Sequence, residues 1–144
     1  DHLAYLKKLV AEKGLEDNFI FTGYRDDVRP CLKDFDVFVI PSNYPDPFPR
    51  SVIEGMSFAL PVVAFKAAGG IVEAVDDGVT GILCAPGDTE EMGKAIARLA
   101  LDPGLGKKMG EAGRERGIAT VSAEAVAREV EKNICLARGR PPEK

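Results

Sequence analysis

Hydrophobic residues recur along the chain in two patterns, one with helical spacing and one of short continuous runs. Leucine and valine at helical spacing over residues 3–10, followed by Gly14, predict a first helix with a left-handed C-terminal cap. Continuous apolar runs bounded by glycine or proline are typical of buried strands in parallel sheets. The runs that predict strands are Asn18–Gly23, Val37–Ile40, Pro61–Phe65 and Gly81–Cys84.

Segments with helical patterns separate these strands. They cover residues 26–33, 52–59, 70–75, 88–99, 105–116 and 122–137. Three glycines weaken the pattern over residues 105–116. The alternation of strands and helices predicts an α/β fold with a Rossmann-like parallel sheet, flanking helices and right-handed crossovers. Ligands of such sheets bind at loops beyond the carboxyl ends of the strands, here residues 23–27, 41–51, 66–71 and 84–88.

Composition narrows the functional classes. The 144 residues are 45% hydrophobic and 29% charged, with a net charge of −4, the mixture of one soluble domain or part of one. The mild acidity argues against a nucleic-acid partner, which a basic face would attract. The apolar runs are far shorter than the ~20 residues that span a bilayer. The single histidine and three scattered cysteines argue against a His-based triad, a metal site and a disulfide framework, and indicate a reducing, cytoplasmic setting.

The two ends of the chain differ from its middle. The chain begins at Asp1 rather than Met and is at once inside a helical pattern, so we expect a fragment of a longer protein. Residues 1–137 are predicted to form one partial domain. Residues 138–144 are polar, carry two prolines and are predicted to form a frayed tail.

The proline-rich loop over residues 41–49 and the helix after it bring two acids together. Pro47 and Pro49 prevent a helix from running through both Asp46 and Glu54, so Asp46 lies on the loop and Glu54 about one turn into the helix. Between them lie the free N–H groups of a helix start, which suit a phosphate. A carboxylate accepts two hydrogen bonds from a hydroxyl pair. This order of groups would suit a sugar–diphosphate–ribose ligand.

A purely structural interpretation stays open at this point. Two acids near a helix start are common, because the helix dipole favours them there. Gly69–Gly70, which precedes a short helix, offers further close backbone amides but is equally explained as a turn. The chain contains no GxGxxG and no P-loop sequence, so dinucleotide binding and NTPase activity lose their strongest support.

Six ordered segments carry a resemblance to a known family. From Gly23 to about Arg116 the chain resembles the nucleotide-sugar-binding domain of GT-B glycosyltransferases, specifically glycosyltransferase family 4. The resemblance implies the truncated C-terminal half of such an enzyme. The matching segments begin at Phe19, Asp36, Asp46, Leu60, Gly69 and Ala85 and read FIFTGY, DVFVIPS, DPFPRSVIEGM, LPVVA, GGIVEAVDDGVTG and APGD.

The resemblance implies roles for individual residues. Asp46 resembles the acid that holds hydroxyls of the donor sugar, and Glu54 the acid that grips the ribose diol. The implied sugar-binding residues are Asp46, Phe48, Pro49 and Arg50. The implied nucleotide-binding residues are Glu54, Ser51, Val52, Tyr24, Arg25, Gly69 and Gly70. Two positions depart from the family: Asp46 replaces a longer Glu, and Pro49 replaces a Gly and has no N–H to donate.

Other parts that the family uses lie outside this chain. The resemblance implies two further strands and a helix upstream, with an Arg and a Lys that neutralise the diphosphate. It also implies an N-terminal domain that binds the acceptor (a glycan, a lipid or a small molecule) and through which any membrane contact would be made. We therefore assign no catalytic residue, metal or cofactor here, and expect the fragment alone to be inactive. In the family's sheet, the upstream strands would lie between the runs that begin at Phe19 and Val37. Without those strands, we expect either that the two runs pair directly or that the first run is loosely held.

Three functions follow, in order of support. The first is the donor domain of a retaining glycosyltransferase, which transfers a sugar from a nucleotide-diphosphate sugar to an acceptor without a metal or a protein nucleophile. The second is a non-catalytic nucleotide- or phosphate-binding module, which the changes at Asp46 and Pro49 permit. The third is a flavodoxin-like signalling domain with a metal held by strand-end acids, for which Asp46 and Glu54 are poorly placed.

Overall fold

The computed structural model describes residues 1–67 and 69–138. They form two compact units, Asp1–Pro30 and the described residues from Cys31 onward, which are described separately. Of the predicted frayed tail, residues 139–144 lie outside the described residues, and Arg138 is the C-cap of the last helix.

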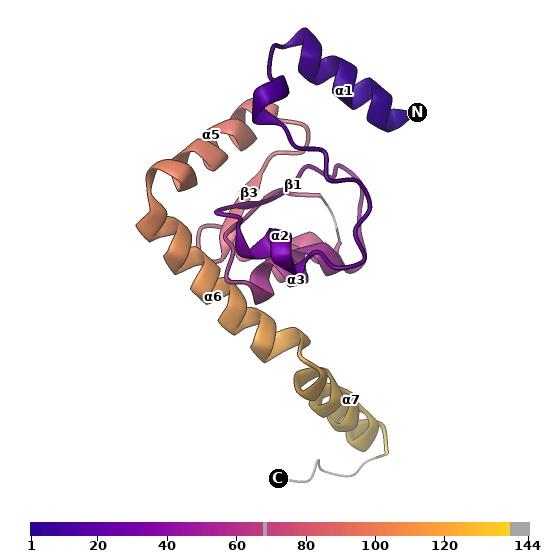
Figure 1. Ribbon diagram of the computed structural model, residues 1–144. Coiled ribbons are helices and arrows are strands. Elements are labelled where there is room, and N and C mark those ends of the chain that lie inside the picture. Colours follow the sequence, from indigo (N-terminus) through magenta and orange to yellow (C-terminus); the bar gives the residue numbers. More distant parts are fainter. Residues whose placement is uncertain (68, 139–144) are drawn as a thin grey trace. The chain divides into compact units, whose positions relative to one another are not determined.

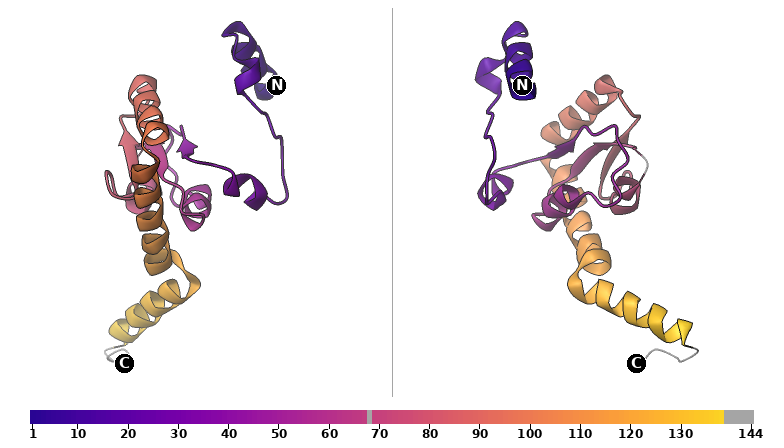
Figure 2. Two further views of the ribbon diagram at one scale, coloured as in Figure 1. Left: turned by 60° about the vertical axis from the view of Figure 1, so that its left-hand side comes forward. Right: turned by 90° about the vertical axis from the view of Figure 1, so that its right-hand side faces the viewer.

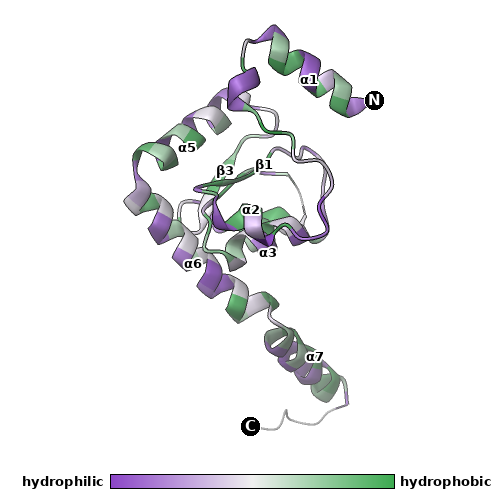
Figure 3. Cartoon of the chain, viewed as in Figure 1, coloured by the Kyte–Doolittle hydropathy of each residue, from purple (hydrophilic) through white to green (hydrophobic). Residues whose placement is uncertain are grey.

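The first unit contains helix α1 (His2–Glu12) and the 3₁₀ turn η1 (Glu16–Asn18). The predicted left-handed cap is confirmed: Gly14 has φ +63°, and its N–H donates to the Ala11 carbonyl oxygen at 3.0 Å. The N–H of Leu15 then donates to the carbonyl oxygen of Val10 at 3.1 Å, which completes a Schellman motif. Figure 3 shows green and purple segments alternating along α1, as expected of an amphipathic helix.

The strand predicted at Asn18–Gly23 is wrong. Phe19 has extended backbone dihedrals, but residues 19–23 belong to no ladder of the described sheet, which has three strands. The rings of Phe19 and Phe21 stack with centroids 6.2 Å apart and line an apolar hollow of about 210 Å³ beside α1, whereas Ile20 is 89% exposed. The alternation of a strand is therefore present, but a strand also needs a neighbour for its N–H and C=O groups.

The second unit is built on a parallel sheet, β1 (Phe38–Ile40), β2 (Val62–Phe65) and β3 (Gly81–Cys84), in that spatial order (Figure 1). Val39 pairs with Val63, and Val63 with Ile82. The short helix α2 (Arg29–Lys33) precedes β1, and its start is capped by the Asp27 carboxylate, which accepts from the Arg29 N–H at 3.1 Å. The parallel sheet predicted from the strand–helix alternation is confirmed, with three strands instead of four.

Two apolar cores cover the two faces of this sheet. Val62 and Ala64 point into one core, which α3 (Arg50–Ser57) and α4 (Gly70–Ala74) complete. Val63 and Phe65 point into the other core, which α5 (Thr89–Leu101) and the first half of α6 (Pro103–Val121) complete. Figure 2 shows α6 continuing past the sheet toward α7 (Ala123–Ala137). Burial on both faces explains why the strands read as continuous apolar runs.

Side chains cap the starts of α5 and α7, where the predicted helical segments 88–99 and 122–137 begin. The Asp88 carboxylate accepts from the Glu91 N–H at 2.9 Å, and the Ser122 hydroxyl from the Ala125 N–H at 3.1 Å. The Glu91 carboxylate accepts from the Ala85 N–H at 2.6 Å. It thereby ties the start of α5 to the end of β3.

The glycine-bearing helix is longer than its pattern predicts. α6 runs without interruption from Pro103 to Val121, because Gly106, Gly110 and Gly113 form a buried face spaced four and three residues apart. A methyl group at Gly110 would collide with the carbonyl oxygen of Ala59. Close backbone packing therefore compensates for the low helix propensity of these glycines.

The predicted apolar stripe of α7 is present but not buried. Val126, Val130 and Ile134 remain about half exposed. Hydropathy along the described helices nowhere reaches what a bilayer-crossing helix requires.

Candidate functional site

The loop over residues 41–49 leaves the carboxyl end of β1 and leads into α3. Within it, a carboxylate oxygen of Asp46 accepts from the Phe48 N–H at 2.9 Å, an Asx turn that folds the chain back on itself. Pro49 is buried and is the N-cap of α3, which begins at Arg50. The predicted arrangement is confirmed: Asp46 lies on the loop, Pro49 directly precedes the helix, and Glu54 lies about one turn into it.

The Gly69–Gly70 turn, at the carboxyl end of β2, lies against this loop. The Gly70 N–H donates to the carbonyl oxygen of Asp46 at 2.6 Å, and Asp46 and Gly69 form an isolated parallel bridge. A methyl group at Gly69 would lie 2.6 Å from the Asp46 carbonyl oxygen, and one at Gly70 would lie 2.6 Å from that of Pro47. Gly69 also has φ +102°, a conformation that L side chains rarely adopt. Both glycines are therefore required for the two loops to touch.

Two backbone amides remain open at the start of α3. Within residues 1–67 and 69–138, the N–H groups of Arg50 and Ser51 have no acceptor. The Val52 N–H donates to the Pro49 carbonyl oxygen at 3.0 Å, and the Val52 side chain is fully buried in the core. The N–H groups of Val52 and Gly70 are therefore already hydrogen-bonded. The backbone amides of the site that are left to donate to an anion are those of Arg50 and Ser51.

Glu54 lies one turn further along α3, on its exposed side. Its carboxylate makes no hydrogen bond or ion pair with any residue that the structure describes. Arg50, four residues earlier and therefore on the same side of the helix, is also exposed and unpaired among these residues. Neither side chain is therefore engaged with another described residue, and the predicted role of Glu54 at the ribose stays a prediction.

Tyr24 and Arg25 belong to the first unit. Both are exposed, with Tyr24 at 92%, and they directly follow Gly23, which has φ +66°. Their predicted role in lining the base stays a prediction.

A hollow of about 250 Å³ adjoins the two loops. Its lining residues are Phe48, Gly70, Glu73, Ala74, Thr120 and Val121. Sequence patterns pointed to the loop residues but not to Thr120 and Val121, which are the last residues of α6 and carry no motif. Only the folding of α6 beside α4 brings them there.

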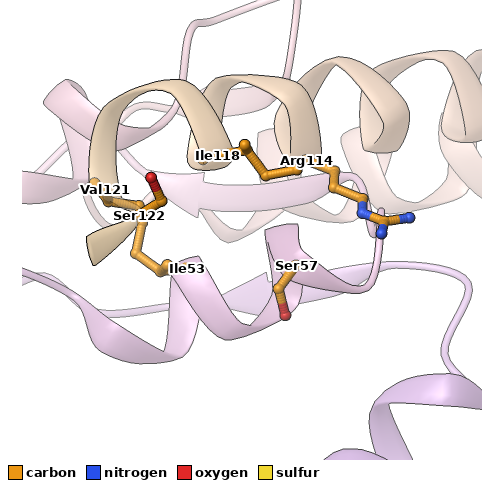
Figure 4. Close-up of a pocket in the computed structure, with 7 residues that line it drawn as sticks. Ile53, Ser57, Arg114, Ile118, Val121 and Ser122 are labelled. Atoms are coloured by element: carbon orange, nitrogen blue, oxygen red, sulfur yellow. The ribbon is translucent and has the colours of Figure 1, made fainter. Parts of the chain in front are cut away.

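A second hollow, of about 200 Å³, lies between α3 and α6 and contains none of the predicted site residues (Figure 4). Figure 4 shows Ile53 of α3 facing Val121 and Ser122 at the end of α6. Its lining is mostly apolar, so it is a packing gap between helices rather than a place for a charged ligand. Elsewhere in the described part of the chain, no group of three or more His, Cys, Asp or Glu side chains is placed to hold a metal ion.

Sheet order, helices and loops together define the C-terminal domain of a GT-B glycosyltransferase. Residues 1–116 match the family model for glycosyl transferases group 1. The chain therefore belongs to that family, glycosyltransferase family 4, and the resemblance predicted from its motifs is confirmed.

Three relatives illustrate the match. The lipopolysaccharide core biosynthesis glycosyltransferase LpsE of Rhizobium meliloti is 31% identical over 121 residues, which cover 84% of this chain and 35% of LpsE. HepE of Anabaena in complex with UDP has a TM-score of 0.86 at 26% identity, over 93% of this chain and 36% of HepE. Other HepE structures hold UDP and glucose, or UDP-glucose. The C-terminal domain of the group 1 glycosyl transferase LpcC from Francisella tularensis has a TM-score of 0.73 at 25% identity, over 84% of this chain and 62% of that structure. The chain spans about a third of the length of curated relatives such as LpsE.

Proposed function

We propose that the 41–49 loop, the first turn of α3 and the Gly69–Gly70 turn bind the donor of a retaining glycosyltransferase, a nucleotide-diphosphate sugar. The observation that carries the proposal is the contact between Asp46 and the two glycines. This contact keeps the Asp46 loop, and the start of α3 with its two unbonded backbone N–H groups, at the carboxyl end of the sheet. Structures of the Anabaena relative with UDP and UDP-glucose support a ligand of this class.

Each part of the donor has a matching group. Asp46, with Phe48, Pro49 and Arg50 around it, would receive the hydroxyls of the sugar. The diphosphate would accept from the Arg50 and Ser51 amides, where the helix dipole favours negative charge. Glu54 would accept from the two hydroxyls of the ribose, since its carboxylate has no other partner in the described structure.

The transfer itself would use groups beyond this chain. No side chain of the site is proposed as a nucleophile or as a metal ligand. The anomeric carbon would be attacked from the face that the diphosphate leaves. The cations that neutralise the leaving group and the surface that binds the acceptor would lie in the parts of the relatives outside the aligned span. Residues 1–137 would then be a partial donor-binding domain, inactive alone.

Glu54→Ala tests the nucleotide half of the proposal. Calorimetry of the chain with UDP, GDP and ADP should show one preferred base, and Glu54→Ala should weaken that binding about tenfold or more, because two hydrogen bonds to a charged acceptor are lost. Glu115→Ala is the matched control, since Glu115 is likewise an exposed, unpaired helix glutamate among the described residues. Equal affinities in the two variants would refute the ribose assignment.

The runner-up is a nucleotide- or phosphate-binding module without transfer. The buried Pro49 favours it, because proline offers a bound sugar no N–H. Comparing UDP-glucose with UDP separates the two functions. A donor site gains affinity from the sugar, whereas a simple phosphate site binds UDP-glucose no more tightly than UDP.

A further inference from the structure

Arg116 joins α6 to α4 through a two-pronged contact. Its guanidinium donates from Nε to the carbonyl oxygen of Ala74 at 3.1 Å and from Nη2 to that of Glu73 at 2.8 Å. Glu73 and Ala74 are the last two residues of α4, 43 and 42 residues away in the sequence. Arg116 is half-buried between these elements.

The acceptors explain why an arginine stands here. Carbonyls in the last turn of a helix have no N–H partner inside the helix and carry partial negative charge. In a helix as short as α4, most carbonyls are in this position. A guanidinium presents two N–H groups in a fixed planar arrangement that can meet two successive carbonyls, whereas a lysine ammonium is a single point of charge.

The position of Arg116 is set by the glycine face of α6. Gly110 brings α6 against the Ala59 carbonyl after α3, and Gly113 brings it close to the backbone of Thr80 before β3. Arg116 follows Gly113 by three residues, so it comes from the same side of the helix, one turn later. α6 is thus held at two backbone contacts before it reaches α4.

The opposite end of α4 holds the site. Gly70, its first residue, donates to the Asp46 carbonyl oxygen, and Gly69 and Gly70 contact the loop backbone. With only five residues in α4, a shift at its C-terminal end displaces Gly70 as well. Because Thr120 and Val121 line the same hollow as Phe48 and Gly70, this part of α6 also borders the loop directly.

We propose that Arg116 is a positioning residue for the donor-binding loop. By holding the C-terminal carbonyls of α4, it keeps the Gly69–Gly70 turn against Asp46 and so sets where the Asp46 carboxylate meets the sugar. The proposal rests on the proposed function of that loop. It assigns to α6 a role in ligand binding that its sequence gives no sign of.

The test compares Arg116→Met and Arg116→Lys with Arg114→Met in the full 144-residue chain. Arg114 is exposed and has no partner within the described residues, so its loss controls for the removal of a positive charge from α6. Arg116→Met is expected to weaken UDP-glucose binding about tenfold, which is about the effect of losing one hydrogen bond. Arg116→Lys should fall between it and the wild type, and Arg114→Met should bind as the wild type does.

Amide hydrogen exchange provides a readout that needs no ligand. In Arg116→Met the Gly70 N–H should exchange at least about tenfold faster relative to the Lys66 N–H, which lies directly after β2 and donates to the Cys84 carbonyl oxygen of β3 at 2.7 Å. An unchanged ratio of Gly70 to Lys66 exchange overturns the proposal. The proposal is also overturned if Arg116→Met unfolds more easily but binds UDP-glucose as the wild type does. If the wild type binds no nucleotide sugar, the proposed function fails instead, and the Gly70 exchange ratio still decides the role of Arg116.

Discussion

The N–H of Gly70 donates to the carbonyl oxygen of Asp46 across 2.6 Å, which joins the loop after β1 to the loop after β2. Neighbouring parallel strands end at the same edge of a sheet, so these loops are close by construction. Contact between their backbones nevertheless requires residues without a Cβ. The candidate site therefore depends on two glycines as much as on its two acids.

Gly69→Ala should damage the site more than a comparable glycine substitution elsewhere. Gly78 is the matched control, because it also has positive φ (+76°) but nothing within 4 Å of an added methyl group. Gly78→Ala should lose about 1–2 kcal/mol of unfolding free energy from backbone strain alone, and Gly69→Ala should lose more because its methyl group also meets the Asp46 backbone. Only Gly69→Ala displaces the Asp46 loop, so it alone should weaken UDP-glucose binding, by about tenfold or more. Urea unfolding and calorimetry measure the two effects, and equal binding by both variants would contradict the prediction.

Asp46→Asn and Asp46→Ala should separate the two tasks of this side chain. Asparagine keeps an oxygen that can accept from the Phe48 N–H, so the turn and the unfolding free energy should be preserved. The loss of charge should reduce the affinity for UDP-glucose but not for UDP. Alanine also removes the acceptor and should lower the unfolding free energy by about 1 kcal/mol. If Asp46→Asn reduces UDP affinity as strongly as UDP-glucose affinity, Asp46 does not act on the sugar.

Gly110→Ala and Gly117→Ala should have opposite effects in the same helix. At Gly110 the new methyl group would meet the Ala59 carbonyl, which must move, at a cost of about 1–3 kcal/mol of unfolding free energy. At Gly117 there is nothing within 4 Å, so alanine should stabilise the protein by about 0.5–1 kcal/mol through helix propensity. Chemical denaturation of both variants is the measurement. A neutral Gly110→Ala would mean that α6 does not pack closely on the segment after α3.

Cys84 should be the slowest of the three thiols to react. It is fully buried, and burial, with the charges of Glu91, Asp77 and Asp88 adding to it, raises the pKa of its thiol, whereas Cys31 and Cys135 are partly exposed. Timed alkylation with mass spectrometry should label Cys31 and Cys135 first and Cys84 only after urea unfolding. Labelling of native Cys84 as fast as Cys135 would contradict this.

The same thiol predicts a dependence of stability on pH. Because its pKa is raised in the folded state, the folded protein binds this proton more tightly than the unfolded chain does. The stabilisation of the folded state by this thiol is therefore fully present below the ordinary thiol pKa of about 8.5. It is lost as the pH rises toward the raised pKa of the thiol in the folded protein. Cys84→Ala, which cannot titrate, should therefore lose less unfolding free energy than the wild type as the pH is raised above about 8.5.

Much of the local structure was predictable because its causes are local. Gly14 ends α1 in the left-handed conformation, and Asp88 and Ser122 cap α5 and α7, as their sequence positions indicate. Each of these features is decided within a few residues of backbone. The double burial of β2 was equally predictable, since an unbroken apolar run has no polar face to expose.

Predictions failed where a partner distant in the sequence decides the outcome. Residues 19–21 alternate as a strand does, yet they join no ladder of the described sheet, because pairing is a property of two segments. The glycines of α6 weaken its helical pattern in the sequence, but in the structure they make close packing contacts. The sequence does not reveal these contacts, because a group such as the Ala59 carbonyl is about 50 residues away from the glycine that it meets.

The sequence by itself determined the family, the order of the helices and of the three strands that form the sheet, and the presence of Asp46 and Glu54 on either side of a helix start. These depend on residue type and spacing, which a linear chain carries in full. Only the tertiary structure decided which amides of that helix start stay open, that Gly69 and Gly70 hold the Asp46 loop, and that Arg116 reaches the end of α4. A hydrogen bond or a steric contact between segments depends on their separation in space, and that separation exists only once the helices have packed on the sheet.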